Sequence, residues 1–263
     1  MKILLLALSF SAVATLTAQE VRLDAPLVLK VDWETRALSS ADIDGDGRVD
    51  LALINNGKAE IEIFYQLAPG EKPGKTKRVV KQDRWEPQMD DAPFERDKLF
   101  TGGDALDLEL GDLNGDGLVD VVFANDLEEI VIHYQEAGGE WSKAITTEVE
   151  GLAAAPGAMV IADLRGDGKQ DLVVVGTNDI LVFVDGNMGS PPERFPLAFS
   201  GLSTLKVIDA DRDGRLDICY GQSLGSETYL VVRAQSEDGQ FFGERFIRIE
   251  GLTSILKEFG KPG

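Results

Sequence analysis

Aspartate recurs at fixed spacing in four short runs of the sequence. The runs read DIDGDGRVD from Asp42, DLNGDGLVD from Asp112, DLRGDGKQD from Asp163 and DADRDGRLD from Asp209, and their starts are 70, 51 and 46 residues apart. In such a run the side chains at positions 1, 3 and 5 can converge on one centre, position 7 offers its carbonyl and the acid at position 9 closes the shell. Hard oxygen ligands in this number suit Ca²⁺ better than Mg²⁺.

An ordinary surface turn and an EF-hand loop are two other interpretations of these runs. A single Asp-Gly cluster is as readily an ordinary surface turn, but four copies in the same context disfavour that. An EF-hand loop requires a glutamate at position 12 and flanking helices. Position 12 is occupied here by Leu53, Phe123, Val174 and Tyr220. The pattern therefore predicts calcium loops between strands, with glycine at position 6 in a positive-φ turn.

The segments around each run predict four strands per repeat. Alternating apolar residues precede each run, and a short apolar stretch such as LALI from Leu51 or LVVV from Leu172 follows it. A third strand is expected at Ile61, Ile130, Ile180 and Tyr229. A more polar fourth strand is expected at about 77–81, 141–147, 195–199 and 246–249. Repeats of this length, with sheets that must stack to bury both faces, indicate an all-β fold, a β-propeller of four-stranded antiparallel blades.

The expected domain organisation follows from these segments. Residues 1–18 have the layout of a secretory signal peptide, and residues 19–263 form the propeller repeats. The blades are expected at approximately 36–82, 105–147, 156–199 and 203–250, with an insertion loop at approximately 68–103. The tail 251–263 resembles the approach to another blade, so we expect about four to five blades, as part of a larger propeller or of an open array that a partner covers.

Composition narrows the possible functions. The formal charge of −20 disfavours nucleic acid and anionic membranes as partners. Cys219 is the only cysteine, so an intrachain disulfide is excluded, and it is expected to be a buried small residue. His133 is the only histidine, and we expect a strand histidine at a blade surface rather than a catalytic base. Neither a phosphate-binding glycine loop nor a nicotinamide fingerprint occurs in the sequence.

The loops with their flanking strands resemble FG-GAP and VCBS repeats, the units of integrin α-subunit propellers and of many bacterial secreted proteins. The Phe-Gly and Gly-Ala-Pro signatures are mostly missing, with one Phe242-Gly243, so the bacterial variety is the closer likeness. The resemblance implies three good calcium sites and a weak or empty one at the third loop, where Arg165 stands at position 3. The implied ligands are Asp42, Asp44, Asp46, Arg48 (carbonyl) and Asp50; Asp112, Asn114, Asp116, Leu118 (carbonyl) and Asp120; Asp163, Asp167 and Asp171; and Asp209, Asp211, Asp213, Arg215 (carbonyl) and Asp217.

The function expected from these features is that of a secreted, periplasmic or cell-surface scaffold that binds a protein or a glycan and is not an enzyme. The alternative is the propeller domain of a calcium-dependent, polysaccharide-active enzyme, because some polysaccharide lyases resemble this chain in placing calcium loops on propellers. A lyase needs basic or aromatic side chains on one face. The candidates lie in the insertion: Lys72, Lys75, Lys77, Arg78, Arg84 and Trp85.

Overall fold

The computed structural model describes residues 31–72, 93–153, 155–199 and 202–249. Every assigned strand lies in the unit Asp32–Gly263. The signal peptide expected at 1–18 lies outside the described residues.

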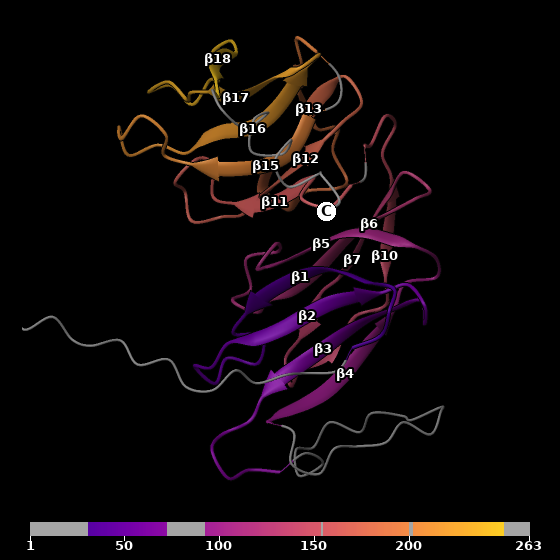
Figure 1. Ribbon diagram of the computed structural model, residues 1–263. Helices are drawn as coiled ribbons and strands as arrows, with labels where there is room; N and C mark the ends of the chain where they lie inside the picture. The colour runs from indigo at the N-terminus through magenta and orange to yellow at the C-terminus, as the bar shows by residue number, and fades with distance from the viewer. Residues whose placement is uncertain (1–30, 73–92, 154, 200–201, 250–263) are drawn as a thin grey trace, which may run out of the picture. The chain divides into compact units, whose positions relative to one another are not determined.

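Most of the strands form four antiparallel sheets of four strands each (Figure 1). The first sheet contains β1 (Thr35–Ala41), β2 (Asp50–Asn55), β3 (Glu60–Gln66) and β4 (Phe94–Phe100); the second contains β5 (Ala105–Gly111), β6 (Asp120–Asn125), β7 (Glu129–His133) and β10 (Ile145–Glu148); the third contains β11 (Met159–Ala162), β12 (Asp171–Val175), β13 (Asp179–Phe183) and β14 (Glu193–Pro196); the fourth contains β15 (Leu202–Ile208), β16 (Asp217–Leu224), β17 (Glu227–Arg233) and β18 (Arg245–Arg248). A hairpin of β8 (Gln135–Glu136) and β9 (Glu140–Trp141) and a 3-10 turn, η1 (Val184–Gly186), complete the described elements. The expected all-β architecture of four-stranded antiparallel sheets is confirmed.

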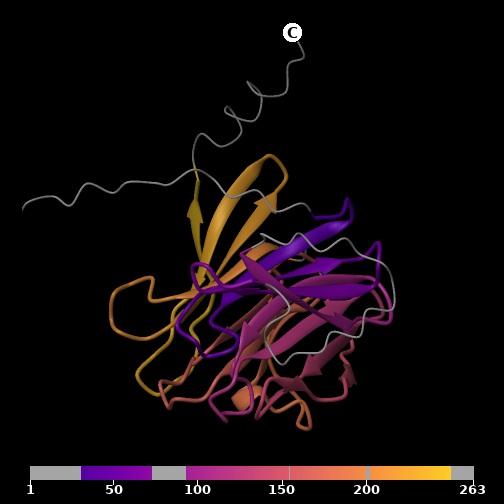
Figure 2. The same cartoon turned by 90° about the horizontal axis from the view of Figure 1, so that it is seen from below.

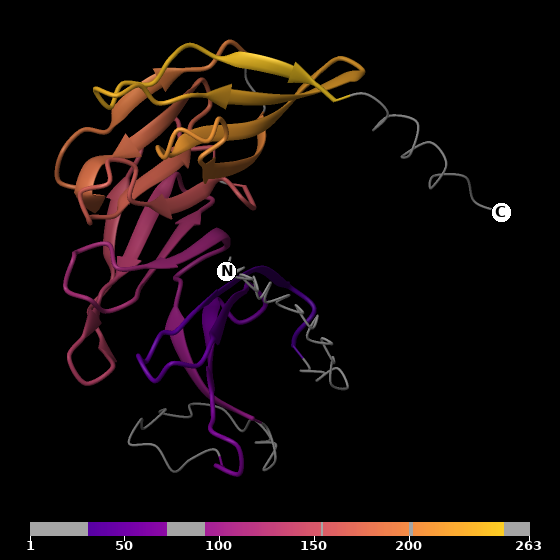
Figure 3. The same cartoon turned by 90° about the vertical axis from the view of Figure 1, so that its left-hand side faces the viewer.

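Within each sheet the chain passes through the strands in sequence order, from the first to the fourth. The last sheet, orange to yellow, can be followed in Figure 2 and from another side in Figure 3. The second strands are short apolar runs with buried side chains on both faces, which is typical of a strand covered on both sides.

Alternate residues of these second strands enter different hydrophobic cores. On β6, Val121 and Phe123 pack with Ile54 of the first sheet, whereas Val122 packs with Leu172 of the third. The odd and even positions of β12 divide in the same way between the second and fourth sheets. Because side chains alternate between the faces of a strand, each middle sheet contributes to two cores, and consecutive sheets are joined through shared apolar layers.

The fourth strand of the first sheet corrects one prediction. It is β4 at Phe94–Phe100, within the segment 68–103 that we expected to be an insertion loop, whereas the fourth strand expected at about 77–81 lies outside the described residues. The charged run between Phe94 and Leu99 concealed the strand. Phe94 packs edge-on against Phe64, with ring centroids 6.3 Å apart, and the Arg96 guanidinium lies 4.9 Å from the centre of the Phe64 ring. The charged residues therefore belong to a packed strand.

A polar contact joins the second and third sheets. Asp107 on β5 is only 3% exposed, and its two carboxylate oxygens accept hydrogen bonds from the backbone nitrogens of Gly157 (3.0 Å) and Met159 (2.8 Å). This side chain fixes β11 beside β5, because the buried amide of Met159 and the half-buried amide of Gly157 depend on it for their hydrogen bonds.

Candidate metal centres

The four aspartate-rich loops occupy the same place in the four sheets, the turn between the first and second strands. The acid at position 9 is in every case the first residue of the second strand: Asp50 of β2, Asp120 of β6, Asp171 of β12 and Asp217 of β16. The glycine at position 6 has a φ between 85° and 89° in all four loops. The predicted positive-φ turn is therefore confirmed, and a side chain at this position would strain the backbone.

The acid at position 9 joins each loop to its own sheet. All four of these residues are at most 1% exposed, and each accepts one hydrogen bond from the amide at position 2 and one from an amide at the end of the third strand. The two distances are 2.8 and 2.7 Å at Asp50, 2.9 and 3.0 Å at Asp120, 3.2 and 2.8 Å at Asp171, and 2.9 and 2.9 Å at Asp217. A carboxylate has about four lone-pair sites, so these bonds leave capacity for a cation.

The first and fourth loops bring three predicted ligands together. Carboxylate oxygens of Asp42, Asp44 and Asp50 lie within 4.8 Å of one another, and the same holds for the group of Asp209, Asp211 and Asp217. One oxygen of Asp42, Oδ1, is buried and has no hydrogen-bond partner. Like charges at this separation repel one another, and a buried carboxylate oxygen without a partner is costly. The residues of these two loops therefore fit a hard divalent cation.

The acid at position 5 has a different partner in these two loops. The Asp46 carboxylate pairs with the Arg48 guanidinium, and Asp213 pairs with Arg215 in the same way. Each guanidinium also donates from Nε to a backbone carbonyl, 2.7 Å to Gln66 at the end of β3 and 3.0 Å to Gln235 just beyond β17. Asp46 and Asp213, predicted as ligands, are thus held by arginine, and only their loop neighbours converge.

The second loop contains three carboxylates and an asparagine. Asp112 accepts hydrogen bonds from three consecutive loop amides at 2.8 to 3.0 Å, and Asn114 donates to the Asp116 carboxylate at 3.0 Å. Its three acids do not form a group as close as those of the first and fourth loops among the described residues. Position 7 is Leu118, so this loop has no arginine at that position.

The third loop does not assemble the ligands Asp163, Asp167 and Asp171 into a close group among the described residues. Arg165 instead lies 2.9 Å from the Asp171 carboxylate, and Lys169 pairs with Asp185 at 2.6 Å. The third loop thus shares with the second the lack of a close group of acids among the described residues, and it differs from the second in placing Arg165 beside the acid at position 9.

Burial makes the acids at position 9 sensitive to nearby charge. It raises the pKa of Asp120 to about 6, and the charge of Asp116 adds to that rise. Burial likewise raises the pKa of Asp50, with the nearby Asp44 contributing in the same direction. At Asp171 burial also raises the pKa, but Arg165 opposes the rise. In the first and second loops, therefore, the ionised acid has an electrostatic cost that a cation in the loop would relieve.

Sequence reasoning missed the residue at position 2, which anchors the first three loops to the next sheet. Ile43, Leu113 and Leu164 are at most 3% exposed, and each belongs to the core shared with the following sheet. The carbonyls of Ile43 and Leu164 accept hydrogen bonds from the side chains of Gln135 (3.0 Å) and Gln235 (2.9 Å), each two residues beyond the third strand of the next sheet. The signal available in the sequence was an apolar residue at position 2 of an otherwise polar loop.

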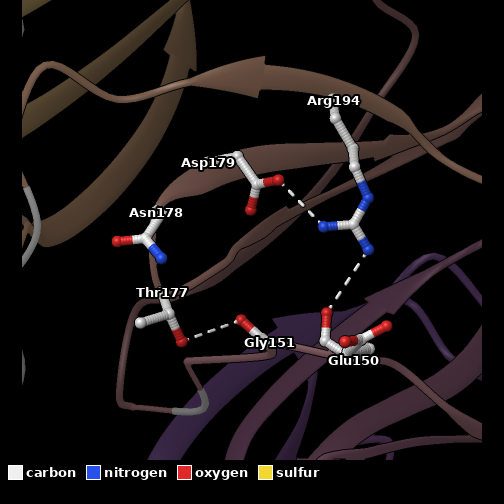
Figure 4. Close-up of a pocket in the computed structure, with 6 residues that line it drawn as sticks. All are labelled: Glu150, Gly151, Thr177, Asn178, Asp179 and Arg194. Atoms are coloured by element: carbon white, nitrogen blue, oxygen red, sulfur yellow. Dashed lines mark hydrogen bonds and ion pairs between the residues drawn. The ribbon is translucent and has the colours of Figure 1, made fainter.

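Two hollows are candidates for ligand contact. One, of about 360 Å³, is lined by Glu150, Gly151, Thr177, Asn178, Asp179 and Arg194 (Figure 4). There Arg194 pairs with Asp179 at 2.8 Å and donates to the Glu150 carbonyl at 3.3 Å. The other, of about 450 Å³, adjoins the first loop and includes Asp44, Asp46 and Arg48 in its lining.

The remaining candidate residues have simpler surroundings or lie outside the described residues. His133 is 7% exposed, which corrects the expected surface position, and its Nδ1 lies 3.1 Å from the Ser142 carbonyl oxygen. The sequence does not show this burial, because it depends on the packing of the imidazole ring against Phe123. Cys219 is buried, as predicted, and burial raises the pKa of its thiol to about 11. Of the basic and aromatic residues proposed for a lyase, only Lys72 is described.

Sheets and loops together define a repeat protein in which each four-stranded sheet carries an aspartate-rich turn between its first two strands. The FG-GAP-like repeat is detected twice in the chain, in residues 112–174 and 163–220. Each match begins at one loop and ends in the strand that follows the next loop. A search of curated proteins finds no match to the chain. No helix in the described part of the chain is long and apolar enough to cross a membrane.

Proposed function

We propose that the chain is a β-propeller that calcium rigidifies, exported from the cytoplasm, and that it serves as a binding scaffold for a protein or a glycan. The observation that carries this proposal is the convergence of Asp42, Asp44 and Asp50, repeated at Asp209, Asp211 and Asp217. The proposed propeller is supported by the sharing of apolar cores between consecutive sheets. Calcium would supply the positive charge that these acids lack.

Each loop residue has a separate part in this proposal. The acids at positions 1 and 3 bind the ion from the exposed side of the loop. The acid at position 9 orients the loop through two backbone amides and presents its carboxylate from the buried side. The carbonyls of Arg48, Leu118 and Arg215 complete the shells in the first, second and fourth loops. Asp46 joins its shell after exchanging Arg48 for the ion, and Asp213 does the same with Arg215.

Rigid loops give the scaffold its binding surface. The hollow beside the first loop includes Asp44, Asp46 and Arg48 in its lining, so an ion in that loop would fix part of the hollow's wall. Loops held by a framework of sheets are where recognition residues concentrate. The ligand is accordingly expected at the exposed loops, with calcium acting through their shape.

Calcium counting and thermal unfolding test the proposal. Native mass spectrometry of the chain is expected to show three bound calcium ions. Excess chelator is expected to lower the Tm, because an ion present at a hundredfold excess over its Kd stabilises the folded state by about 2.7 kcal/mol per site. Asp42→Asn and Asp209→Asn should each remove one ion, while Asp126→Asn, outside the loops, should remove none. An unchanged Tm after verified metal removal would count against the calcium role.

A glycan array and a polysaccharide degradation assay, run on the same protein, would distinguish a glycan-binding scaffold from a polysaccharide-active enzyme.

A further inference from the structure

Arg165 has surroundings that no other residue at position 3 shares. Its Nη1 lies 2.9 Å from Oδ1 of Asp171, and its Nη2 lies 3.1 Å from Oε1 of Glu193 on β14. The Asp171 side chain is 2% exposed and that of Arg165 is 29% exposed. The guanidinium therefore enters the loop from its exposed side and reaches the buried acid at position 9.

The other loops have no such cation at this position. Position 3 is Asp44 in the first loop, Asn114 in the second and Asp211 in the fourth, and each of these side chains offers an oxygen. The arginines at position 7, Arg48 and Arg215, pair with the acid at position 5. The formal charge of the nine residues is −3 in the first and second loops, −2 in the fourth and −1 in the third.

The backbone of the third loop is nevertheless built like the others. Asp171 accepts hydrogen bonds from Leu164 (3.2 Å) and Asp185 (2.8 Å), and Asp163 accepts one from Gly168 at 2.8 Å. The same three contacts hold the first loop, from Ile43, Gln66 and Gly47 at 2.7 to 2.9 Å. The loop fold is therefore the same, and the charge at its centre is what differs.

We propose that the Arg165 guanidinium takes the place of a metal ion in the third loop, so that this loop is closed by a cation belonging to the chain itself. A guanidinium supplies one positive charge and up to five N–H donors in a planar fork. It neutralises Asp171 and ties the loop to β14 through Glu193. The third loop is then independent of calcium, and it stays attached to its sheet through Asp171 when the other loops lose their ions. The proposal rests on the calcium role proposed above only in its comparison with the other loops.

The first test is whether removing Arg165 creates a metal site. Arg165→Asn gives the loop the position-3 residue of the second loop, whereas Arg165→Leu removes the charge without supplying an oxygen. Native mass spectrometry should count one more calcium ion in Arg165→Asn than in the wild type and no more in Arg165→Leu. Adding Asp163→Asn to Arg165→Asn should remove the extra ion. A wild-type chain that loses an ion on Asp163→Asn would overturn the proposal. So would a folded Arg165→Asn variant that gains no ion while the wild type binds calcium at its other loops.

The second test does not require calcium. Arg165→Leu leaves the buried Asp171 without its cation, so its Tm should fall by about 5 °C or more, and by the same amount in excess calcium and in excess chelator. Arg194→Leu, which removes an arginine of the same sheet that pairs with Asp179, is the matched control and should shift the Tm less. A wild-type melting curve for Arg165→Leu in chelator would overturn the proposal. If the wild type binds no calcium but Arg165→Leu still melts early in chelator, the proposed function fails while the role of Arg165 stands.

Discussion

Glu109 on β5 provides a test of the packing between sheets through the pH dependence of stability. Burial raises its pKa to about 7, with the neighbouring Asp107 adding to the rise and Lys206 opposing it. Its ordinary value is 4.5. The pKa of Glu109 is higher in the folded than in the unfolded state, so below about pH 4.5, where both states are protonated, this residue does not lower the free energy of unfolding. The free energy of unfolding then decreases as the pH rises from about 4.5 through 7. The full cost of ionisation in the folded state corresponds to about 3 kcal/mol.

The substitution Glu109→Gln should remove that cost, because glutamine stays neutral and none of the described contacts gives Glu109 a hydrogen bond that would be lost. The variant should be about 3 kcal/mol more stable than the wild type at pH 8 and less than about 1 kcal/mol more stable at pH 5. Urea unfolding in excess chelator at the two pH values measures the difference, and Glu148→Gln on exposed β10 is the control. An equal effect of Glu109→Gln at both pH values, or a loss of stability at pH 8, would refute the argument from burial.

Three further predictions follow from single contacts. Asp107→Ala should destabilise the chain by about 2–4 kcal/mol, because it orphans the amides of Gly157 and Met159. Asp107→Asn keeps one acceptor oxygen, so in urea unfolding it should lower the free energy of unfolding by roughly half as much. Equal losses in the two variants would argue against separate roles for the two carboxylate oxygens. Gly186→Ala should cost more than about 3 kcal/mol, since a Cβ there would lie 2.4 Å from Leu113 Cγ, whereas Gly166→Ala, at a similar φ but with nothing within 4 Å, should cost about 1 kcal/mol. Arg48→Leu should tighten calcium binding by the first loop about two- to fivefold, since it frees Asp46 from its ion pair. Calorimetric titration in an Asp112→Asn/Asp209→Asn background measures this affinity, with Arg36→Leu as the control, and a weaker affinity would contradict the reasoning.

The sequence was sufficient to predict the strands that carry a simple period or a long apolar run. Apolar alternation before each loop predicted β1, β5, β11 and β15, and the apolar runs after each loop predicted the second strands. The constant offset from the loop predicted the third strands near Ile61, Ile130, Ile180 and Tyr229. These patterns are local, so they survive without knowledge of the tertiary contacts. The strand β4 has no such local pattern, because it contains the charged residues Glu95–Lys98. These charges are accommodated by residues distant in the sequence, such as Glu60, which lies 2.9 Å from Lys98.

The candidate site was predictable to the extent that it depends on loop spacing. Positions 1, 3 and 9 do converge in the first and fourth loops, as the spacing predicts. Position 5 does not, because the orientation of Asp46 depends on Arg48, whose own position depends on the Gln66 carbonyl 18 residues away. The same limit applies to Ile43 and Leu113, whose anchoring role requires the next sheet to be in place. Contacts between two sheets are therefore hard to predict from the spacing of residues within one segment of the sequence.

The contacts common to all four loops indicate that the loop is in the first place a joint between strands. The acid at position 9 binds the same two amides whether its neighbour at position 3 is an acid, an amide or Arg165. The residue at position 2 enters the core of the next sheet in the first three loops, whereas in the fourth it is the exposed Ala210. Backbone hydrogen bonds and apolar contacts thus define the joint, and the group that neutralises its acids can vary. Under the two proposals made above, calcium in three loops and a guanidinium in one neutralise the same buried acid, and exchanging the residue at position 3 should exchange one cation for the other.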